Sequence, residues 1–328
     1  MADLRPGAAL VLGVDAGGTK TDACLLTLDG DVLGLGHAGP GNWEAVGVRA
    51  AADAVARATR DALGDRPAAR VVAATFAMAG VDWPDDKTRL APALGAITPA
   101  AQPDLVNDAY AALAAGAPDG AGIVSIAGTG GLTAGRNQAG DTFRTMGQLL
   151  GEAGGAISVV TRALAAVARS RNGVAPATLL SSALADFHGV ASADRLFAAL
   201  SRGELDVRAD AAPVVFEAAR DGDAAAAAVV GAVARDHARD VHGVATRLGL
   251  DAEPFTLVRA GGVALSANPV FDREWSAAVT ALLPRARETC LAAPPVAGAG
   301  LLALRRLGLQ AAALHARVLQ NVAAAARA

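Results

Sequence analysis

The chain has 328 residues, of which 53% are hydrophobic, and this length suits two domains of ordinary size better than one. Its formal net charge is −3 and it has no block of Lys and Arg residues, which argues against nucleic acid as a partner. Its two cysteines, Cys24 and Cys290, lie far apart in apolar contexts, so we expect reduced, buried thiols and no zinc or iron–sulfur site.

The sequence shows no segment of the length and composition that a membrane span needs. The longest apolar run, residues 224–234, is about half as long as a spanning helix. Residues 1–12 lack the basic start and the long apolar stretch of a secretion signal. We therefore expect a cytoplasmic protein without a membrane partner.

The start of the chain predicts a meander of three strands. Residues 10–14 are rich in Leu and Val, and residues 21–28 alternate between apolar and polar side chains. The pair Asp29-Gly30 is a strong hairpin signal, after which residues 31–36 predict the returning strand.

The same arrangement recurs later in the chain. Strands are again predicted at residues 122–127, 132–136 and 141–145, separated by glycine-containing turns. The spacing from Thr129 to Gly140 equals the spacing from Thr19 to Gly30. This repeated unit predicts two related domains that face each other, with chance similarity of glycine-rich hairpins as the alternative.

The rest of the chain alternates helical and strand patterns. We expect a helix at 48–62, strands at 71–78, 105–106 and 255–258, mostly helices from the second meander to residue 250, and helices again over 301–328. The segment 116–120, Gly-Ala-Pro-Asp-Gly, can hold no regular element. We therefore predict two domains, 1–116 and 117–328, with the last helix able to pack back on the first domain.

An acidic residue, glycines and hydroxyls follow one another where the first predicted strand ends. Asp15 can hold Mg²⁺ through water, and the backbone N–H groups of the Gly17-Gly18 turn can cradle phosphate oxygens. The segment is not a Walker P-loop, because Thr19 stands where that motif needs lysine and a strand follows instead of a helix. An ordinary hairpin turn is the alternative.

The corresponding turn of the second unit is the Gly-Thr-Gly-Gly sequence at residues 128–131. By itself this motif is weak and could be purely structural. Two such turns that face each other across a cleft, however, would enclose the phosphates of a nucleotide from both sides.

Asp108 lies between a predicted strand and a predicted helix. A carboxylate there can accept the proton of a sugar hydroxyl as that hydroxyl attacks a γ-phosphate. The alternative is structural, since Asn107 and Asp108 are both residue types that cap helices.

These three segments, in this order and spacing, resemble the phosphate-1, connecting and phosphate-2 motifs of the sugar kinase/heat-shock/actin superfamily. Within it the chain most resembles the N-acetylglucosamine kinase branch of the BadF/BadG/BcrA/BcrD ATPase family, from Gly13 to the C-terminal helices. The resemblance implies an α/β fold with two ribonuclease H-like (actin-like ATPase) domains flanking a nucleotide cleft. It places sugar and phosphate binding in the first domain and adenosine binding in the second.

The resemblance also implies roles for individual residues. Asp15 corresponds to the Mg²⁺-associated acid, and Thr19 and Thr129 correspond to hydroxyls that contact ATP phosphates. Asp108 corresponds to the general base, which also binds the sugar. The further residues expected to contact ATP around these positions are Gly17, Gly18, Lys20 and Gly130.

Asn42-Trp43 resembles the loop that contacts the sugar in this family, and Gly130 and Gly131 correspond to the loop beside the sugar. Trp43 is alternatively a hydrophobic lid residue, which sugar binding would draw into the cleft as the domains close.

Residues 147–155 resemble the family's Gly-x-x-x-Gly-Asp-Glu-Gly-Ser segment, with two departures. Glu152 occupies the usual aspartate position, and Ala153 replaces the glutamate. The longer carboxylate of Glu152 can still accept hydrogen bonds from sugar hydroxyls but shortens the pocket. This departure leaves the identity of the sugar open.

Toward the C-terminus, residues 259–263 resemble the family's adenosine motif, in which Gly261 and Gly262 let the adenine lie against the backbone. Ser266 corresponds to a contact in the same loop, and Gly222 to a glycine on the adenine side. Asp-Gly turns before helices are common, so a plain turn is the alternative at Gly222.

The resemblance implies ATP-dependent phosphorylation of an amino sugar at its 6-hydroxyl, with ATP and Mg²⁺ as cofactors. N-acetylglucosamine is the expected substrate, and glucosamine, N-acetylmuramate and glucose remain open. The alternatives are a non-catalytic ATP-binding regulatory module and an iron–sulfur ATPase activator, for which neither cysteine is suitably placed. The group also implies a homodimer.

Overall fold

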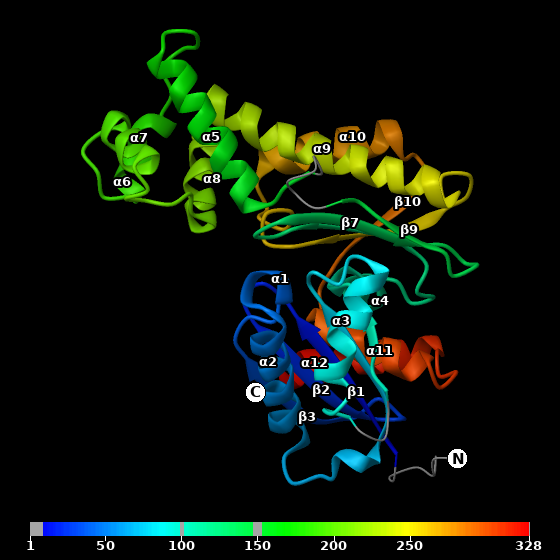
Figure 1. Ribbon diagram of the computed structural model, residues 1–328. Coiled ribbons are helices and arrows are strands. Elements are labelled where there is room, and N and C mark those ends of the chain that lie inside the picture. Colours follow the sequence, from blue (N-terminus) through cyan, green and yellow to red (C-terminus); the bar gives the residue numbers. More distant parts are fainter. Residues whose placement is uncertain (1–8, 99–101, 147–152, 328) are drawn as a thin grey trace. The chain divides into compact units, whose positions relative to one another are not determined.

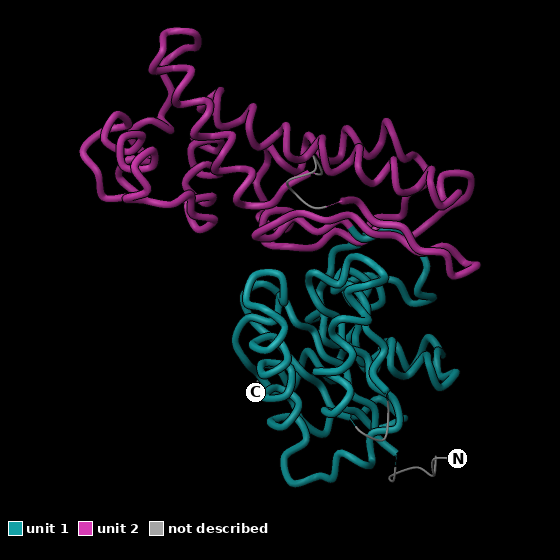
Figure 2. Tube along the Cα trace, viewed as in Figure 1, with its two compact units in different colours: residues 1–124, 289–328 teal, residues 125–288 magenta. Residues whose placement is uncertain are grey.

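The computed structural model describes residues 9–98, 102–146 and 153–327. The chain forms two compact units, coloured separately in Figure 2: residues 1–124 with 289–328 form unit 1, and residues 125–288 form unit 2. Each unit contains one five-stranded sheet and is described on its own. The predicted domain limits, 1–116 and 117–328, stay predictions.

Unit 1 contains a mixed sheet in the order β3-β2-β1-β4-β5. Its strands are β1 (Leu10–Ala16), β2 (Thr21–Thr27), β3 (Val32–Ala38), β4 (Val71–Met78) and β5 (Asp104–Val106). Strands β1, β2 and β3 form the antiparallel meander, and β4 lies parallel to both β1 and β5. The carboxyl ends of β1, β4 and β5 therefore meet at one edge of the sheet.

The helices of unit 1 pack on both faces of this sheet (Figure 1). They are α1 (Trp43–Val46), α2 (Val48–Leu63), α3 (Pro84–Leu94), α4 (Asp108–Gly116), α11 (Pro295–Arg305) and α12 (Ala312–Ala325), with a 3-10 turn at Ala68–Arg70. Because alternate residues of a strand face opposite sides, Leu10, Leu12 and Val14 join one buried cluster with α2, whereas Val11 joins another with α11 and α12.

Glycine allows an unusually close approach between the sheet and helix α11. A Cβ atom on Gly13 of β1 would lie 2.2 Å from the backbone nitrogen of Gly300. Such a contact is sterically impossible, so only glycine fits at this point of β1. The strand that leads to Asp15 is thereby fixed against a helix from the far end of the chain.

Unit 2 contains the second sheet, in the order β10-β9-β6-β7-β8. Its strands are β6 (Gly122–Ala127), β7 (Gly131–Arg136), β8 (Thr142–Arg144), β9 (Phe255–Ala260) and β10 (Ala286–Cys290). The chain passes between the units within β6 and again within β10. Strand β6 leads directly into the glycine turn at residues 128–131.

The rest of unit 2 is helical. Its helices are α5 (Ala156–Arg171), α6 (Leu180–Phe187), α7 (Ala193–Ser201), α8 (Ala212–Arg220), α9 (Ala224–Leu248) and α10 (Pro269–Leu282), with a 3-10 turn at Ala209–Ala211. The long helix α9 packs against β7 and also contacts α5, α8 and α10 (Figure 1). It therefore links the sheet to the helical part of the unit.

The structure corrects two details of the sequence-based expectations. Strand β10 was not expected, because it carries charged and exposed side chains rather than an apolar alternation. Cys290, at its end, is exposed and not buried as expected, whereas Cys24 is buried. Among the described residues, no helix is both long and apolar enough to cross a membrane.

Candidate functional site

The first glycine turn connects β1 to β2 in unit 1. The backbone N–H of Gly17 donates to the carbonyl of Lys20 at 2.9 Å, which closes the turn, and Gly18, Thr19 and Lys20 are exposed. The turn therefore presents backbone N–H groups, a hydroxyl and an ammonium group at the sheet edge, a combination suited to an anion.

Asp15 precedes this turn and has an unusual charge environment. Burial, together with the negative charges of Asp108 and Asp22, raises the pKa of Asp15 to about 8, and Lys20 opposes the shift. Lys20 itself pairs with Asp22 at 2.6 Å. A divalent cation beside Asp15 would relieve the repulsion among these acids and ionise Asp15, so the donor set fits Mg²⁺.

Asp108 is the first residue of helix α4, but it does not cap the helix. The cap is Asn107, whose side-chain oxygen accepts a hydrogen bond from the N–H of Ala109 at 3.0 Å. Asn107 is buried and Asp108 is half-buried. The N-cap of α4 is therefore Asn107, and Asp108 is the acid of the first turn, with its carboxylate within electrostatic reach of Asp15.

The Asn42-Trp43 segment packs beside the same turn. The N–H groups of Gly41 and Asn42 donate to the carbonyl of Gly17 at 2.9 and 3.1 Å, and the Asn42 side chain caps the short helix α1. The Trp43 indole N–H donates to the carbonyl of Gly80 at 2.6 Å. Its ring also lies under the guanidinium of Arg89, 5.5 Å from the ring centroid. Trp43 is thus held within unit 1, and a lid movement would have to break these contacts.

The second glycine turn, in unit 2, rests on the start of helix α5. The N–H of Gly128 donates to the carbonyl of Gly130, and the N–H of Ala156 donates to the carbonyl of Gly128 at 2.8 Å. A Cβ on Gly155 would lie 2.1 Å from the carbonyl oxygen of Gly130. The turn and the helix start are therefore in direct backbone contact, which only glycine at position 155 permits.

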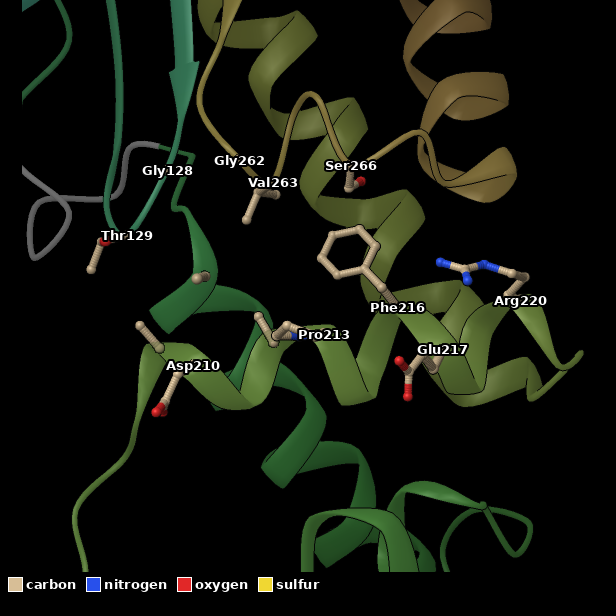
Figure 3. A pocket seen from close by; sticks show the side chains of 13 residues that line it. Gly128, Thr129, Asp210, Pro213, Phe216, Glu217, Arg220, Gly262, Val263 and Ser266 are labelled. Atoms are coloured by element: carbon tan, nitrogen blue, oxygen red, sulfur yellow. The ribbon is translucent and has the colours of Figure 1, made fainter. Parts of the chain in front are cut away.

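A cavity of about 660 Å³ opens beside this turn, entirely within unit 2 (Figure 3). It is lined by the second glycine turn, the start of α5, one face of α8 with the 3-10 turn before it, and the turn after β9; the residues are Gly128, Thr129, Ala156, Ala209, Asp210, Ala212, Pro213, Phe216, Glu217, Arg220, Gly262, Val263 and Ser266. Apolar walls with a few polar groups suit the base and ribose of a nucleotide.

The turn after β9 is shaped by Gly261. This residue has φ of 92°, and a Cβ on it would lie 2.3 Å from the carbonyl oxygen of Ala127. The same carbonyl accepts hydrogen bonds from the N–H groups of Val263 and Ala264 at 2.9 and 3.2 Å. Gly261 therefore lets the turn dock against the end of β6, next to the second glycine turn.

Ser266 contributes a buried hydroxyl oxygen that the described residues leave without a hydrogen-bond partner. Ser266 also lines the cavity, across from Phe216 in Figure 3. Because an unpaired buried hydroxyl is costly, this atom is suited to bond a ligand in the cavity.

Helix α8 supplies residues that the sequence analysis missed. Pro213, Phe216, Glu217 and Arg220 line the cavity from one helix face, at the spacing of three to four residues that a helix turn produces. That spacing is visible in the sequence, but nothing in the sequence says that this face borders a cavity. Gly222, which was expected on the adenine side, lies in the turn after α8 and outside the set of lining residues.

The predicted site residues thus form two groups. Unit 1 brings together Asp15, Gly17, Gly18, Thr19, Lys20, Asn42, Trp43 and Asp108, and unit 2 brings together Thr129, Gly130, Gly131, Gly261, Gly262 and Ser266. Glu152 lies outside the described residues. Each group lies within its own unit.

Residues 12–275 match the family described as the BadF/BadG/BcrA/BcrD ATPase family. A curated relative, the N-acetylmuramic acid/N-acetylglucosamine kinase of Clostridium acetobutylicum, is 27% identical over 268 residues, which cover 80% of this chain and 88% of the relative.

Solved structures show the same fold. A candidate N-acetylglucosamine kinase from Chromobacterium violaceum superposes with a TM-score of 0.66 at 23% identity, covering 90% of this chain and 99% of that chain. A second, from Porphyromonas gingivalis, has a TM-score of 0.65 at 21% identity, with coverage of 90% and 99%. The predicted fold class, α/β with ribonuclease H-like (actin-like ATPase) domains, is confirmed.

Proposed function

The chain belongs to the BadF/BadG/BcrA/BcrD ATPase family, and from this premise we propose that it is an ATP-dependent sugar kinase. The observation that carries the proposal is the pair of acids at one sheet edge. Asp15 and Asp108 interact electrostatically, and the N-cap of α4 is Asn107 rather than Asp108. Phosphoryl transfer to a hydroxyl needs one acid near the metal and phosphates and another near the acceptor.

The unit 2 cavity is the proposed adenosine site. The base would lie between the α8 face and the Gly262–Ser266 turn, with the Ser266 hydroxyl as one of its polar contacts. Thr129 lies toward one end of the cavity and Arg220 toward the other (Figure 3). We place the phosphates at the Thr129 end, where the turn offers backbone N–H groups together with Gly130.

Unit 1 is the proposed phosphoryl-transfer side. Gly17, Gly18, Thr19 and Lys20 would contact the phosphates, and Asp15 would hold Mg²⁺ through water. Mg²⁺, when bound, would neutralise charge on the phosphate oxygens. Asp108 would accept the proton of the sugar 6-hydroxyl and aim its oxygen at the γ-phosphorus.

An amino sugar is the proposed substrate, with N-acetylglucosamine first and glucosamine or N-acetylmuramate as alternatives. Asn42 is a proposed sugar contact, because its side-chain oxygen is engaged in capping α1 and its amide nitrogen can donate to a sugar oxygen. The curated relative is named for N-acetylmuramic acid and N-acetylglucosamine. Trp43, Gly130, Gly131 and Glu152 stay proposed sugar contacts, and a homodimer and a cytoplasmic location stay predictions.

The iron–sulfur alternative finds no support at Cys24. Its thiol donates to the carbonyl of Val296 at 3.3 Å inside the core, and burial raises the pKa of Cys24 to about 12. A thiol so disposed to stay protonated is a poor metal ligand.

Product analysis tests the proposal directly. Incubation with ATP, Mg²⁺ and N-acetylglucosamine should give ADP and one sugar monophosphate, whose phosphorus-31 spectrum shows coupling to the two protons on carbon 6. Release of free phosphate without a sugar phosphate would instead support an ATPase, and no turnover would support the non-catalytic module.

A further inference from the structure

The loop between β4 and α3, residues 79–83, holds Trp43 through the carbonyl of Gly80 and lies at the same sheet edge as Asp108. It begins where β4 ends, and the N–H of Ala79 donates to the carbonyl of Ala16 at 2.9 Å. Asp86 fixes the other end, because one of its carboxylate oxygens accepts from the N–H groups of Asp82 and Trp83 at 2.9 and 2.7 Å. The loop is therefore tied down on both sides.

Asp82, within this loop, is joined to the residue that precedes Asp108. The side-chain nitrogen of Asn107 donates to the carboxylate of Asp82 at 2.8 Å, while the side-chain oxygen of Asn107 caps α4 through Ala109. Both polar atoms of the buried Asn107 side chain therefore form hydrogen bonds. Because Asn107 is held at its nitrogen, its oxygen is held in the capping position, and this fixes the first turn of α4.

The same loop also contacts the segment proposed to bind the sugar. The carbonyl of Gly80 accepts from the Trp43 indole, and a Cβ on Gly80 would lie 3.0 Å from the Asn42 side-chain oxygen. Gly80 has φ of 81°, a conformation that favours glycine. Loop 79–83 therefore connects Asn42 and Trp43 on one side with Asn107 and Asp108 on the other.

We propose that Asp82 is a positioning residue for the general base: through Asn107 it sets the place of Asp108 relative to the sugar-binding segment. This inference rests on the proposed kinase function. A base must lie within hydrogen-bond reach of the hydroxyl proton, and a displacement of about 1 Å can lower the rate by about 10²-fold. The proposed role uses the acceptor oxygen of Asp82, which an amide oxygen at the same position can replace.

Two substitutions at this position separate geometry from charge. Asp82→Ala removes the acceptor for the Asn107 amide, whereas Asp82→Asn keeps an oxygen that can accept the same hydrogen bond. Asp85→Ala is the matched control, because Asp85 is an exposed acid in the first turn of the same helix α3. All three variants are assayed as full chains with ATP and N-acetylglucosamine.

We expect Asp82→Ala to lower kcat by about 10²-fold with an unchanged KM for ATP. Asp82→Asn should stay within about fivefold of the wild-type kcat, because a neutral hydrogen bond replaces a charge-assisted one. Asp85→Ala should stay within about twofold. The proposal is wrong if Asp82→Ala stays within about fivefold of Asp85→Ala, or if Asp82→Asn falls as far as Asp82→Ala.

Hydrogen exchange distinguishes failure of this inference from failure of the proposed function. Amides at the start of α4, the N–H of Ala109 above all, should exchange faster in Asp82→Ala than in Asp85→Ala, whether or not the protein phosphorylates a sugar. Unchanged exchange there overturns the positioning role. Faster exchange in a protein that phosphorylates no sugar would leave the link to α4 standing and remove the catalytic reason for it.

Discussion

Asn107 and Asp108 stand side by side at the start of α4; Asn107 is its N-cap, and Asp108 is the proposed general base. Asn107 caps the helix, so replacing Asp108 by Asn keeps the cap, and the lost charge in the first turn should cost no more than about 1 kcal/mol in the free energy of unfolding. We predict that Asp108→Asn folds and binds ATP normally, with a melting temperature within a few degrees of the wild type, but loses at least about 10²-fold in kcat. Steady-state kinetics and calorimetry check both parts.

The matched control for that variant is Asn107→Ala. Asn107→Ala removes the N-cap and should therefore lower the free energy of unfolding by about 1 kcal/mol. Asp108→Asn keeps the N-cap and should not show the loss that comes from removing it. An Asp108→Asn enzyme with near-normal kcat would show that Asp108 is not the base.

Ser266 offers a second test at the scale of one residue. Its hydroxyl forms no bond within the described part of the chain, so Ser266→Ala should not lower the free energy of unfolding and can raise it by about 1 kcal/mol. The KM for ATP should nevertheless rise by about 3–10-fold, which is the value of one hydrogen bond. Ser201→Ala, at the exposed end of α7, is the control. An unchanged KM would remove Ser266 from the nucleotide site.

Helix α9 supports the second glycine turn through buried polar side chains. One ring nitrogen of His237, Nε2, lies 3.2 Å from the carbonyl of Gly154, which can only accept, so Nε2 carries the proton. The other, Nδ1, then accepts from the Ser125 hydroxyl at 3.0 Å. Asp240, one turn along, accepts from the N–H of Ala153 at 2.8 Å. Helix α9 thus holds β6, through Ser125, next to residues 153–154, which lead into α5.

This arrangement makes a prediction about pH. Burial lowers the pKa of His237 from 6.5 to about 4, so the folded protein binds fewer protons at this position than the unfolded chain. Its contribution to stability is complete above about pH 6.5 and is lost as the pH falls toward 4. Urea titrations at pH 7 and pH 5 should show a decrease in the free energy of unfolding that is smaller in His237→Gln. An equal decrease in both proteins would contradict the neutral, buried state of His237.

At the scale of elements, the sequence predicted the strands well where local patterns decide. The meanders β1–β3 and β6–β8 follow from apolar strands punctuated by glycine turns such as Asp29-Gly30, which are local signals. Strand β10 could not be found this way, because its residues are exposed and charged and it is placed by pairing with β9. The sequence could not predict that one face of α8 lines a cavity, because long-range packing decides what a helix face borders.

For the whole molecule, family membership and a repeated strand–turn–strand unit both support the proposal of an ATP-dependent kinase with two glycine turns at its phosphates. The glycine turns end β1 and β6, the first strands of the two meanders, and each carries a hydroxyl residue, Thr19 or Thr129. The sequence could identify both turns because each is a local run of glycines and a hydroxyl residue directly after an apolar strand. It could not identify Asp82, whose position depends on a hydrogen bond across 25 residues of chain.

The central claim is that the chain phosphorylates an amino sugar with ATP, and the most direct measurement is coupled ADP release over a panel of sugars. We predict sugar-dependent ADP release with kcat/KM highest for N-acetylglucosamine, followed by glucosamine, and lowest for glucose. N-acetylmuramate belongs in the same panel. ADP release that is independent of sugar, or a higher kcat/KM for glucose than for either of the two ranked amino sugars, would contradict the account.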